Sequence, residues 1–169
     1  MNMHFKMTAT MLDHVIADLR RPHPFAGERA GFIGCKVSRS REGILILAHT
    51  YLTLKDDWYA DDQQYGCFFN ANAMRSAMQF ALTNEASIFH IHMHDHMGLP
   101  WFSRTDLRES RKFVPDFWNV RPNLPHGTLV VSVDSAAGLC WYPSEHKPTR
   151  ISRITAVGFP MRFLERLHE

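Results

Sequence analysis

The spacing of hydrophobic positions predicts a helix near the beginning of the chain. Apolar residues between Met11 and Leu19 recur every three or four positions, as they do on the buried face of an amphipathic helix. Pro22 should end this helix, because proline disfavours helical geometry in the residue before it. We therefore expect the chain to open with a helix that packs one face on the rest of the protein.

Two strands and a second helix should follow. Ala30–Val37 and Ile44–Thr53 are rich in branched and aromatic residues, and the short polar stretch between them predicts a hairpin. Ala73–Leu82 then carries small and apolar residues at helical spacing, which predicts a helix with one buried face. Asn70 or Asn72 is a suitable N-cap for it, since an asparagine side chain can accept a backbone hydrogen bond in the first turn.

A strand that ends in histidines is the next predicted element. Ala86–His94 combines branched and aromatic residues with alternating histidines. Asp95–Phe102 contains a glycine and a proline, which are typical of a loop. Ser103 is then placed as a helix N-cap, with the carboxylate of Asp106 in the first turn. The loop should therefore connect the end of this strand to the start of a third helix.

The remainder of the chain predicts three more strands and a tail. Thr128–Asp134 and Gly138–Tyr142 should flank a turn at Ser135–Ala137, and Ile151–Gly158 should form the last strand. A short amphipathic tail should follow, with the apolar residues Phe163, Leu164 and Leu167. This order of helices and strands predicts an α/β fold, in which one mixed β-sheet is flanked by helices, as a single domain over residues 1–169.

The composition is typical of such a domain, and the charge and cysteine content indicate which partners and which cellular compartment to expect. The 169 residues are 45% apolar and 21% charged, and the formal net charge is only +2, so nothing in the charge favours a nucleic-acid or membrane partner. No apolar stretch is long enough to span a bilayer, and Met1–Met7 lacks the features of a secretory signal. Three scattered cysteines predict reduced thiols in a cytoplasmic protein.

His92 and His94 are the first candidates for chemistry. Side chains two apart on a strand point to the same face, so these imidazoles should project together from the strand end. Asp106 could reach them across the connecting loop, and two histidines with one carboxylate are a ligand set of catalytic zinc. Each residue alone is more often a packing residue or a helix cap. Four alternating histidines, from His90 to His96, nevertheless need polar partners if they are buried, and a metal supplies one.

The stretch from His92 to Asp106, HMHDHMGLPWFSRTD, resembles the motif of the JAB/MPN+ (JAMM) zinc metallopeptidases. That motif is His-x-His, a loop that often contains Gly-x-Pro, and then Ser-x-x-Asp. The family also needs an upstream glutamate at the start of an early strand, and Glu28 in GERAGFIG is similar to its Glu-x-x-Gly pattern. The intervening elements are predicted in the family's order. The resemblance implies a JAB/MPN-like fold and is greatest to the bacterial members associated with ubiquitin-like proteins.

The spacing inside the motif departs from the family and leaves a rival ligand pair. The family usually has proline after the second histidine, where this chain has Asp95. Eight residues separate His94 from Ser103, and six separate His96 from it, so His94 and His96 could be the ligands instead. The apolar run that leads into His92 favours His92 and His94, with His96 in the loop.

The resemblance implies a mechanism as well as a ligand set. Zn²⁺ held by His92, His94 and Asp106 would lower the pKa of a bound water towards about 7 and polarise the scissile carbonyl. Glu28 would take the proton of that water and pass it to the leaving amine. Ser103 would donate to the developing oxyanion. Glu28 and Ser103 are therefore the expected catalytic residues.

The resemblance also implies a substrate and partners. Bacterial members commonly cleave after the C-terminus of a ubiquitin-like protein, to release it from conjugates or to process a precursor, beside activating and conjugating enzymes. Trimming of a ubiquitin-like sulfur-carrier protein is a close variant. The acidic stretch Lys55–Tyr65 and the aromatic pair Trp101–Phe102 are further candidates for partner contacts, although a solvated loop and core packing are the commoner roles of such residues.

Two other function classes compete with the peptidase. A metal-free MPN domain could serve as a scaffold or interaction module, but the presence of all five candidate residues favours catalysis. A non-haem iron oxygenase uses a similar set of two histidines and one carboxylate. Such enzymes commonly use a double-stranded β-barrel, which the helices predicted here disfavour.

Overall fold

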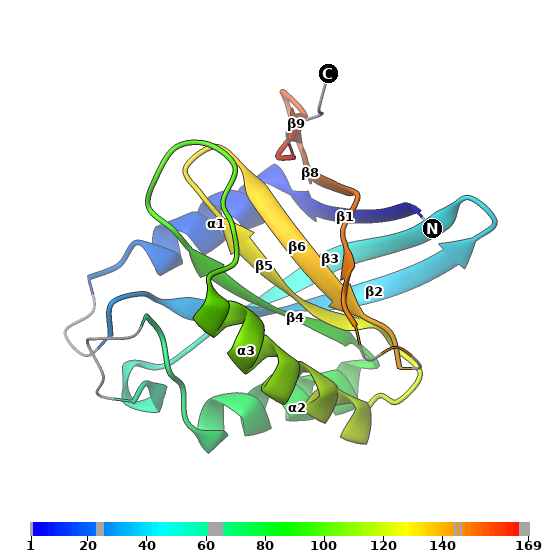
Figure 1. Ribbon diagram of the computed structural model, residues 1–169. Coiled ribbons are helices and arrows are strands. Elements are labelled where there is room, and N and C mark those ends of the chain that lie inside the picture. The colour runs from blue at the N-terminus through cyan, green and yellow to red at the C-terminus, as the bar shows by residue number, and fades with distance from the viewer. Residues whose placement is uncertain (1, 23–25, 61–65, 144, 146, 166–169) are drawn as a thin grey trace.

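The computed structural model describes residues 2–22, 26–60, 66–143, 145 and 147–165, and these form one α/β domain (Figure 1). Its strands are β1 (Asn2–Thr8), β2 (Ala30–Ser40), β3 (Gly43–Thr53), β4 (Ser87–Met93), β5 (His126–Val131), β6 (Ala136–Trp141), β7 (Thr149–Arg150), β8 (Arg153–Val157) and β9 (Arg162–Phe163). Its helices are α1 (Ala9–Leu19), α2 (Ala71–Asn84), α3 (Arg104–Phe113) and two short 3-10 helices, η1 (Asp56–Trp58) and η2 (Val114–Asn119). The predicted α/β fold with one mixed sheet and flanking helices is confirmed.

The nine strands form one sheet in the order β7-β6-β5-β4-β2-β3-β1-β8-β9. β4 runs parallel to β5, and β1 runs parallel to both β3 and β8, whereas the other neighbours are antiparallel. The sheet curls into a half-barrel, so that β6 contacts β8 although five strands lie between them in the sheet. β4, which contains His92, and β2, which begins two residues after Glu28, lie in its middle.

Each face of the sheet has its own hydrophobic core and its own helices. Along β4, Phe89 and Ile91 belong to the core that α1 covers with Leu12, Val15 and Leu19. Ile88 belongs to the opposite core, which α2 covers with Ala73, Ala77 and Ala81. Figure 1 shows α1 on one side of the sheet and α2 and α3 on the other. Because side chains alternate along a strand, His90 and His92 face α2 and α3 together with Ile88.

The expectation that the chain opens with a helix is wrong, because the strand β1 precedes α1. Met3, Phe5 and Met7 are buried on β1, and the residues between them are more exposed, so the segment has the two-residue period of a strand. β1 lies between β3 and β8, so it joins β8 and β9 to the other strands of the sheet. α1 then begins after the N-cap Thr8, earlier than Met11.

Of the two N-caps predicted for α2, the structure has Asn70, whose side chain accepts a hydrogen bond from the Asn72 backbone N–H. Other boundaries differ from the predictions by a few residues. The turn predicted at Ser135–Ala137 is displaced, because both alanines are already in β6 and pair with β5. Phe163 of the predicted tail lies in the short strand β9.

Some predicted features lie wholly or partly outside the described residues. The acidic loop is described up to residue 60 and contains η1, whereas residues 61–65 are outside, as is Leu167 of the tail. No helix in the described part of the chain is both long and apolar enough to cross a membrane. Cys35, Cys67 and Cys140 are free thiols.

Candidate metal centre

The pairing of β2 with β4 brings Glu28 to the histidines. Ala30 lies opposite His92 in an antiparallel ladder, so the residue two before Ala30 falls beside the residue two after His92. These residues are Glu28 and His94, and their side chains meet at 4.0 Å, from Oε1 to Nε2. The rings of His92 and His94 lie on the same face with their centroids 5.0 Å apart. The register of two strands therefore assembles residues that are more than 60 positions apart in sequence.

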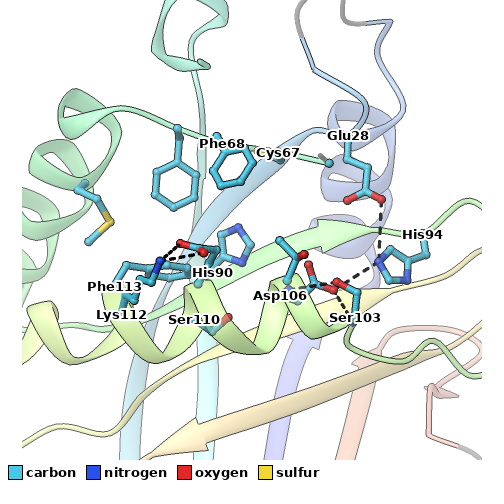
Figure 2. Close-up of a pocket in the computed structure, with 15 residues that line it drawn as sticks. Glu28, Cys67, Phe68, His90, His94, Ser103, Asp106, Ser110, Lys112 and Phe113 are labelled. Atoms are coloured by element: carbon cyan, nitrogen blue, oxygen red, sulfur yellow. Dashed lines mark hydrogen bonds and ion pairs between the residues drawn. The ribbon is translucent and has the colours of Figure 1, made fainter. Parts of the chain in front are cut away.

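The start of α3 supplies Ser103 and Asp106. The Asp106 N–H donates to the Ser103 hydroxyl oxygen (3.1 Å), and the Ser103 N–H donates to Oδ2 of Asp106 (2.7 Å), which is a capping box. The predicted N-cap is confirmed. The same Oδ2 atom faces both His92 and His94, so the capping box also directs the carboxylate into the site. Figure 2 shows Asp106 and Ser103 beside His94.

Four side chains with metal-binding atoms converge here. The donor atoms of Glu28, His92 and His94 all lie within 4.8 Å of one another, so these three residues could hold a metal ion. Oδ2 of Asp106 is 3.5 Å from Nε2 of His92 and 3.8 Å from Nε2 of His94. With bonds of about 2.0–2.1 Å, the ligand atoms of a tetrahedral zinc lie about 3.4 Å from one another. Asp106 lies outside that group of three, but it approaches both histidines at close to the spacing that such an ion requires.

His92 is the side chain with the strongest need for a further partner. It is 3% exposed, and neither of its ring nitrogens has a hydrogen-bond partner among the described residues. A buried polar group without a partner is destabilising, and such groups are uncommon in folded proteins. Oδ2 of Asp106 lies 3.5 Å from Nε2, and a cation between the two atoms would bind both.

The two carboxyl groups of the site have pKa values that are shifted in opposite directions. Burial acts to raise the pKa of Asp106, but His92 and Ser103 outweigh this effect and hold the pKa well below its usual range. Burial raises the pKa of Glu28; the opposing effect of His92 is smaller, and the charge of Asp106 adds to the rise. Burial and His92 lower the pKa of His94. Asp106 is therefore the carboxylate that stays ionised most readily, and the Glu28 carboxylate has the greater affinity for a proton.

His96, the alternative ligand, lies outside the group of donors that could hold a metal ion. Its ring stacks on Trp101, with centroids 5.1 Å apart, and its Nδ1 lies 2.9 Å from the carbonyl oxygen of Met97. The loop that carries it is fixed by the β5–β6 turn, because the Gly98 N–H donates to Asp134 and the Ser132 hydroxyl donates to the Gly98 carbonyl. The structure therefore places His92, not His96, with Glu28 and His94.

The site opens into a cleft of about 440 Å³ between α3 and the segment 66–69 (Figure 2). Nothing in the sequence pattern identified this segment. Its position follows from tertiary hydrogen bonds, because the carbonyl oxygen of Gly66 accepts bonds from the N–H groups of Gly27 and Glu28. Arg29, 3% exposed, also holds the strand start by donating to the carbonyl oxygens of Arg21 and Pro22. The sequence pattern predicted neither the bonds to Gly66 nor those of Arg29, which together position the backbone at Glu28.

Comparison with known proteins adds nothing to the site: no protein-family model and no curated protein matches the chain. The geometry of these residues and the resemblance of their motif are therefore the observations that bear on function.

Proposed function

We propose that the protein is a zinc-dependent peptidase that hydrolyses the amide bond after the C-terminus of a ubiquitin-like protein. The observation that carries this proposal is the convergence of His92 and His94 with two carboxylates in a cleft, together with the buried ring nitrogens of His92, which make no hydrogen bond. The motif that contains these residues resembles that of the JAMM peptidases, whose chemistry uses the same residue types.

His92, His94 and Asp106 are the proposed zinc ligands. Their facing atoms are 3.5 and 3.8 Å apart, close to the spacing around a tetrahedral ion, and the low pKa of Asp106 keeps its carboxylate ionised. Glu28 stands further from His94, at 4.0 Å, and is the most exposed of the four side chains. This leaves Glu28 available for proton transfer.

When bound, zinc would lower the pKa of a coordinated water towards about 7 and polarise the substrate carbonyl. Glu28 would accept a proton from the attacking water and pass it to the leaving amine, a role that suits a carboxylate whose pKa is raised by burial.

Ser103 is the proposed donor to the oxyanion. Its hydroxyl oxygen accepts the Asp106 N–H in the capping box, so that bond does not use the hydroxyl proton. Ser103 lines the cleft with Glu28 and His94, where the proton could be donated to a substrate oxygen as negative charge develops. The capping box thereby fixes both a ligand and a catalytic donor.

The substrate class follows from the motif resemblance. An extended, glycine-rich tail of a ubiquitin-like protein would enter the cleft beside Glu28 and His94. Release from conjugates, processing of a precursor and trimming of a sulfur-carrier protein all end in the same hydrolysis. Activating and conjugating enzymes of such a pathway are the expected functional partners.

Metal content after zinc-supplemented purification is the first test. We expect one zinc per chain in the wild-type protein and in His96→Ala, and loss of zinc in His92→Ala with retention of the fold by circular dichroism. Loss of zinc in His96→Ala and its retention in His92→Ala would instead identify His94 and His96 as the ligands. A wild-type protein that binds no zinc would contradict the peptidase and favour a metal-free scaffold.

Hydrolysis is the second test. A ubiquitin-like protein with a short C-terminal extension should be cleaved by the zinc-loaded wild type and not by His92→Ala. Zinc binding without cleavage of any conjugate, extension or sulfur-carrier precursor would reject the proposed activity. Bound iron with oxygen consumption would instead support the oxygenase class.

A further inference from the structure

The cleft continues past the metal-binding residues into a pocket with apolar walls. We define the distal pocket as the part of the cleft lined by Cys67, Phe68, Phe69, Met74 and Phe113, beside which His90, Ser110 and Lys112 also line the cleft. The proposed catalytic sequence does not use any of these residues. Figure 2 shows Phe68 and Phe113 facing this space, on the side of Asp106 away from His94. At about 440 Å³, the whole cleft is large enough for a substrate side chain in addition to the scissile bond.

The aromatic wall of the distal pocket is held by contacts of its own. The ring of Phe69 packs edge-to-face on Phe32 and on Phe113, with centroids 5.5 and 5.4 Å apart. Phe69 and Phe113 both contact the buried ring of His90, at 5.7 and 5.2 Å. These contacts fix the two phenylalanines before any substrate binds, which reduces the entropic cost of binding.

Two charged residues that line the cleft, Glu109 and Lys112, form an ion pair. Glu109 accepts hydrogen bonds from Lys112 at 3.0 and 3.1 Å, and it also accepts one from Arg108 at 2.8 Å. Both Glu109 and Lys112 line the cleft. Glu109 and Lys112 already pair with each other, so neither presents an unpaired charge to a substrate group in the cleft.

We propose that the distal pocket binds the side chain of a bulky apolar residue that follows the scissile bond and supplies the leaving amine. This inference rests on the proposed function. A ubiquitin-like tail ending in glycine has no side chain to fill the pocket on the carbonyl side. Glu28, which would protonate the leaving amine, lines the same cleft and is bonded through its backbone to Gly66, next to Cys67. The proposal favours a linear precursor over a lysine conjugate as substrate.

Binding of product-like amines to metal-free protein tests the pocket without catalysis. Phenylalanine amide should bind at least about tenfold more tightly than glycinamide in calorimetric titrations, as expected for burial of an aromatic side chain. Met74→Ala should weaken phenylalanine amide roughly fivefold to tenfold. Met78→Ala is the matched control, because Met78 is a partly buried residue of the same helix that does not line the cleft. Equal affinities of the two amides, or equal effects of the two variants, would overturn the proposal.

Cleavage then separates this inference from the proposed function. The zinc-loaded enzyme should cleave a ubiquitin-like protein followed by phenylalanine at least about tenfold faster, in kcat/KM, than the same protein followed by glycine. Equal rates would overturn the distal-pocket proposal and leave the peptidase intact. Cleavage of neither substrate would overturn the proposed function, and the binding titrations would still decide whether the pocket takes an apolar side chain.

Discussion

At the scale of single residues, the four side chains of the candidate metal centre differ in how firmly they are held. Asp106 is fixed by the Ser103 N–H, and His92 is enclosed by the sheet and by α3. Glu28 is one-third exposed and its carboxylate makes a long contact of 4.0 Å with His94. A ligand should be held rigidly, whereas a proton carrier must reach both water and a leaving group, so these differences agree with the proposed roles.

Replacement of Glu28 tests that division of roles. Glu28→Gln should retain zinc, because the three proposed ligands are unchanged, and should lower turnover by a factor of at least about 100. Zinc content and kcat measured on the same preparation decide the point. Glu42→Gln, in the exposed β2–β3 turn, is the control for a lost surface carboxylate. Loss of zinc in Glu28→Gln would make Glu28 a ligand.

His126 predicts a pH dependence of stability that is separate from catalysis. It accepts the Ile88 N–H at Nδ1 and lies 3.2 Å from the Arg121 carbonyl oxygen at Nε2, and burial lowers its pKa from 6.5 to about 4. The unfolded chain then binds the proton more readily than the folded protein does. The stability present above pH 6.5 should therefore decline as the pH falls towards 4, by up to roughly 3 kcal/mol.

Urea unfolding of chelator-treated protein between pH 7.5 and 4.5 measures this effect. His126→Asn keeps an acceptor for the Ile88 N–H and does not titrate in this range, so its unfolding free energy should fall less steeply than that of the wild type. Parallel profiles of unfolding free energy against pH for the two proteins would show that His126 does not cause the loss of stability at low pH.

At the scale of elements, α3 has a structural and a chemical role at the same residues. Its capping box stabilises the first turn, and the same box orients the carboxylate of Asp106 and the hydroxyl of Ser103 towards the cleft. The N-terminus of α3 also contributes partial positive charge, which favours the ionised form of a carboxylate in the first turn. Loss of the cap should therefore affect more than helix stability.

Ser103→Ala separates the two roles of the cap when it is compared with another N-cap. Each of Ser103→Ala and Thr8→Ala removes a side-chain acceptor at a helix start and should cost about 1 kcal/mol of unfolding free energy. Only Ser103→Ala should also lower kcat, by roughly 100-fold, because Thr8 caps α1 on the other face of the sheet. Equal kcat values at matched stability would remove Ser103 from catalysis.

At the scale of the whole molecule, the curled sheet depends on β1. This strand pairs in parallel with β3 and β8 and carries Phe5, which is fully buried and packs edge-to-face on Phe89 at 5.3 Å. Phe89 lies on β4, on the face opposite the candidate site. The hydrophobic core that contains Phe5 therefore packs on the face of β4 opposite to His90 and His92.

Phe5→Ala should destabilise the whole domain. We expect a loss of about 3–5 kcal/mol of unfolding free energy, from lost burial and from the cavity left behind. Phe163→Ala makes the same chemical change at a side chain that is 50% exposed and should change the stability by less than about 1 kcal/mol. Chemical unfolding of both variants provides the comparison, and similar losses would contradict a central role for β1.

Local patterns along the chain determined much of the fold and half of the site. Helical spacing marked α1 and α2, and the helix signal at Ser103 and Asp106 corresponds to an observed capping box. The alternation of His92 and His94 placed both rings on one face. Each of these features depends on residues within one or two turns, or within one strand, so the sequence by itself contains the information. The alternation of Met3, Phe5 and Met7 in β1 is local information of the same kind.

Only the tertiary structure decided how these pieces meet. The register of Ala30 opposite His92 brings Glu28 to His94, and the bonds from Gly66 place an aromatic wall beside them. The choice of His92 over His96 likewise depends on the β5–β6 turn that fixes the loop. Pairings between residues far apart in the chain are set by the packing of the whole sheet, for which a single sequence carries no local periodic signal.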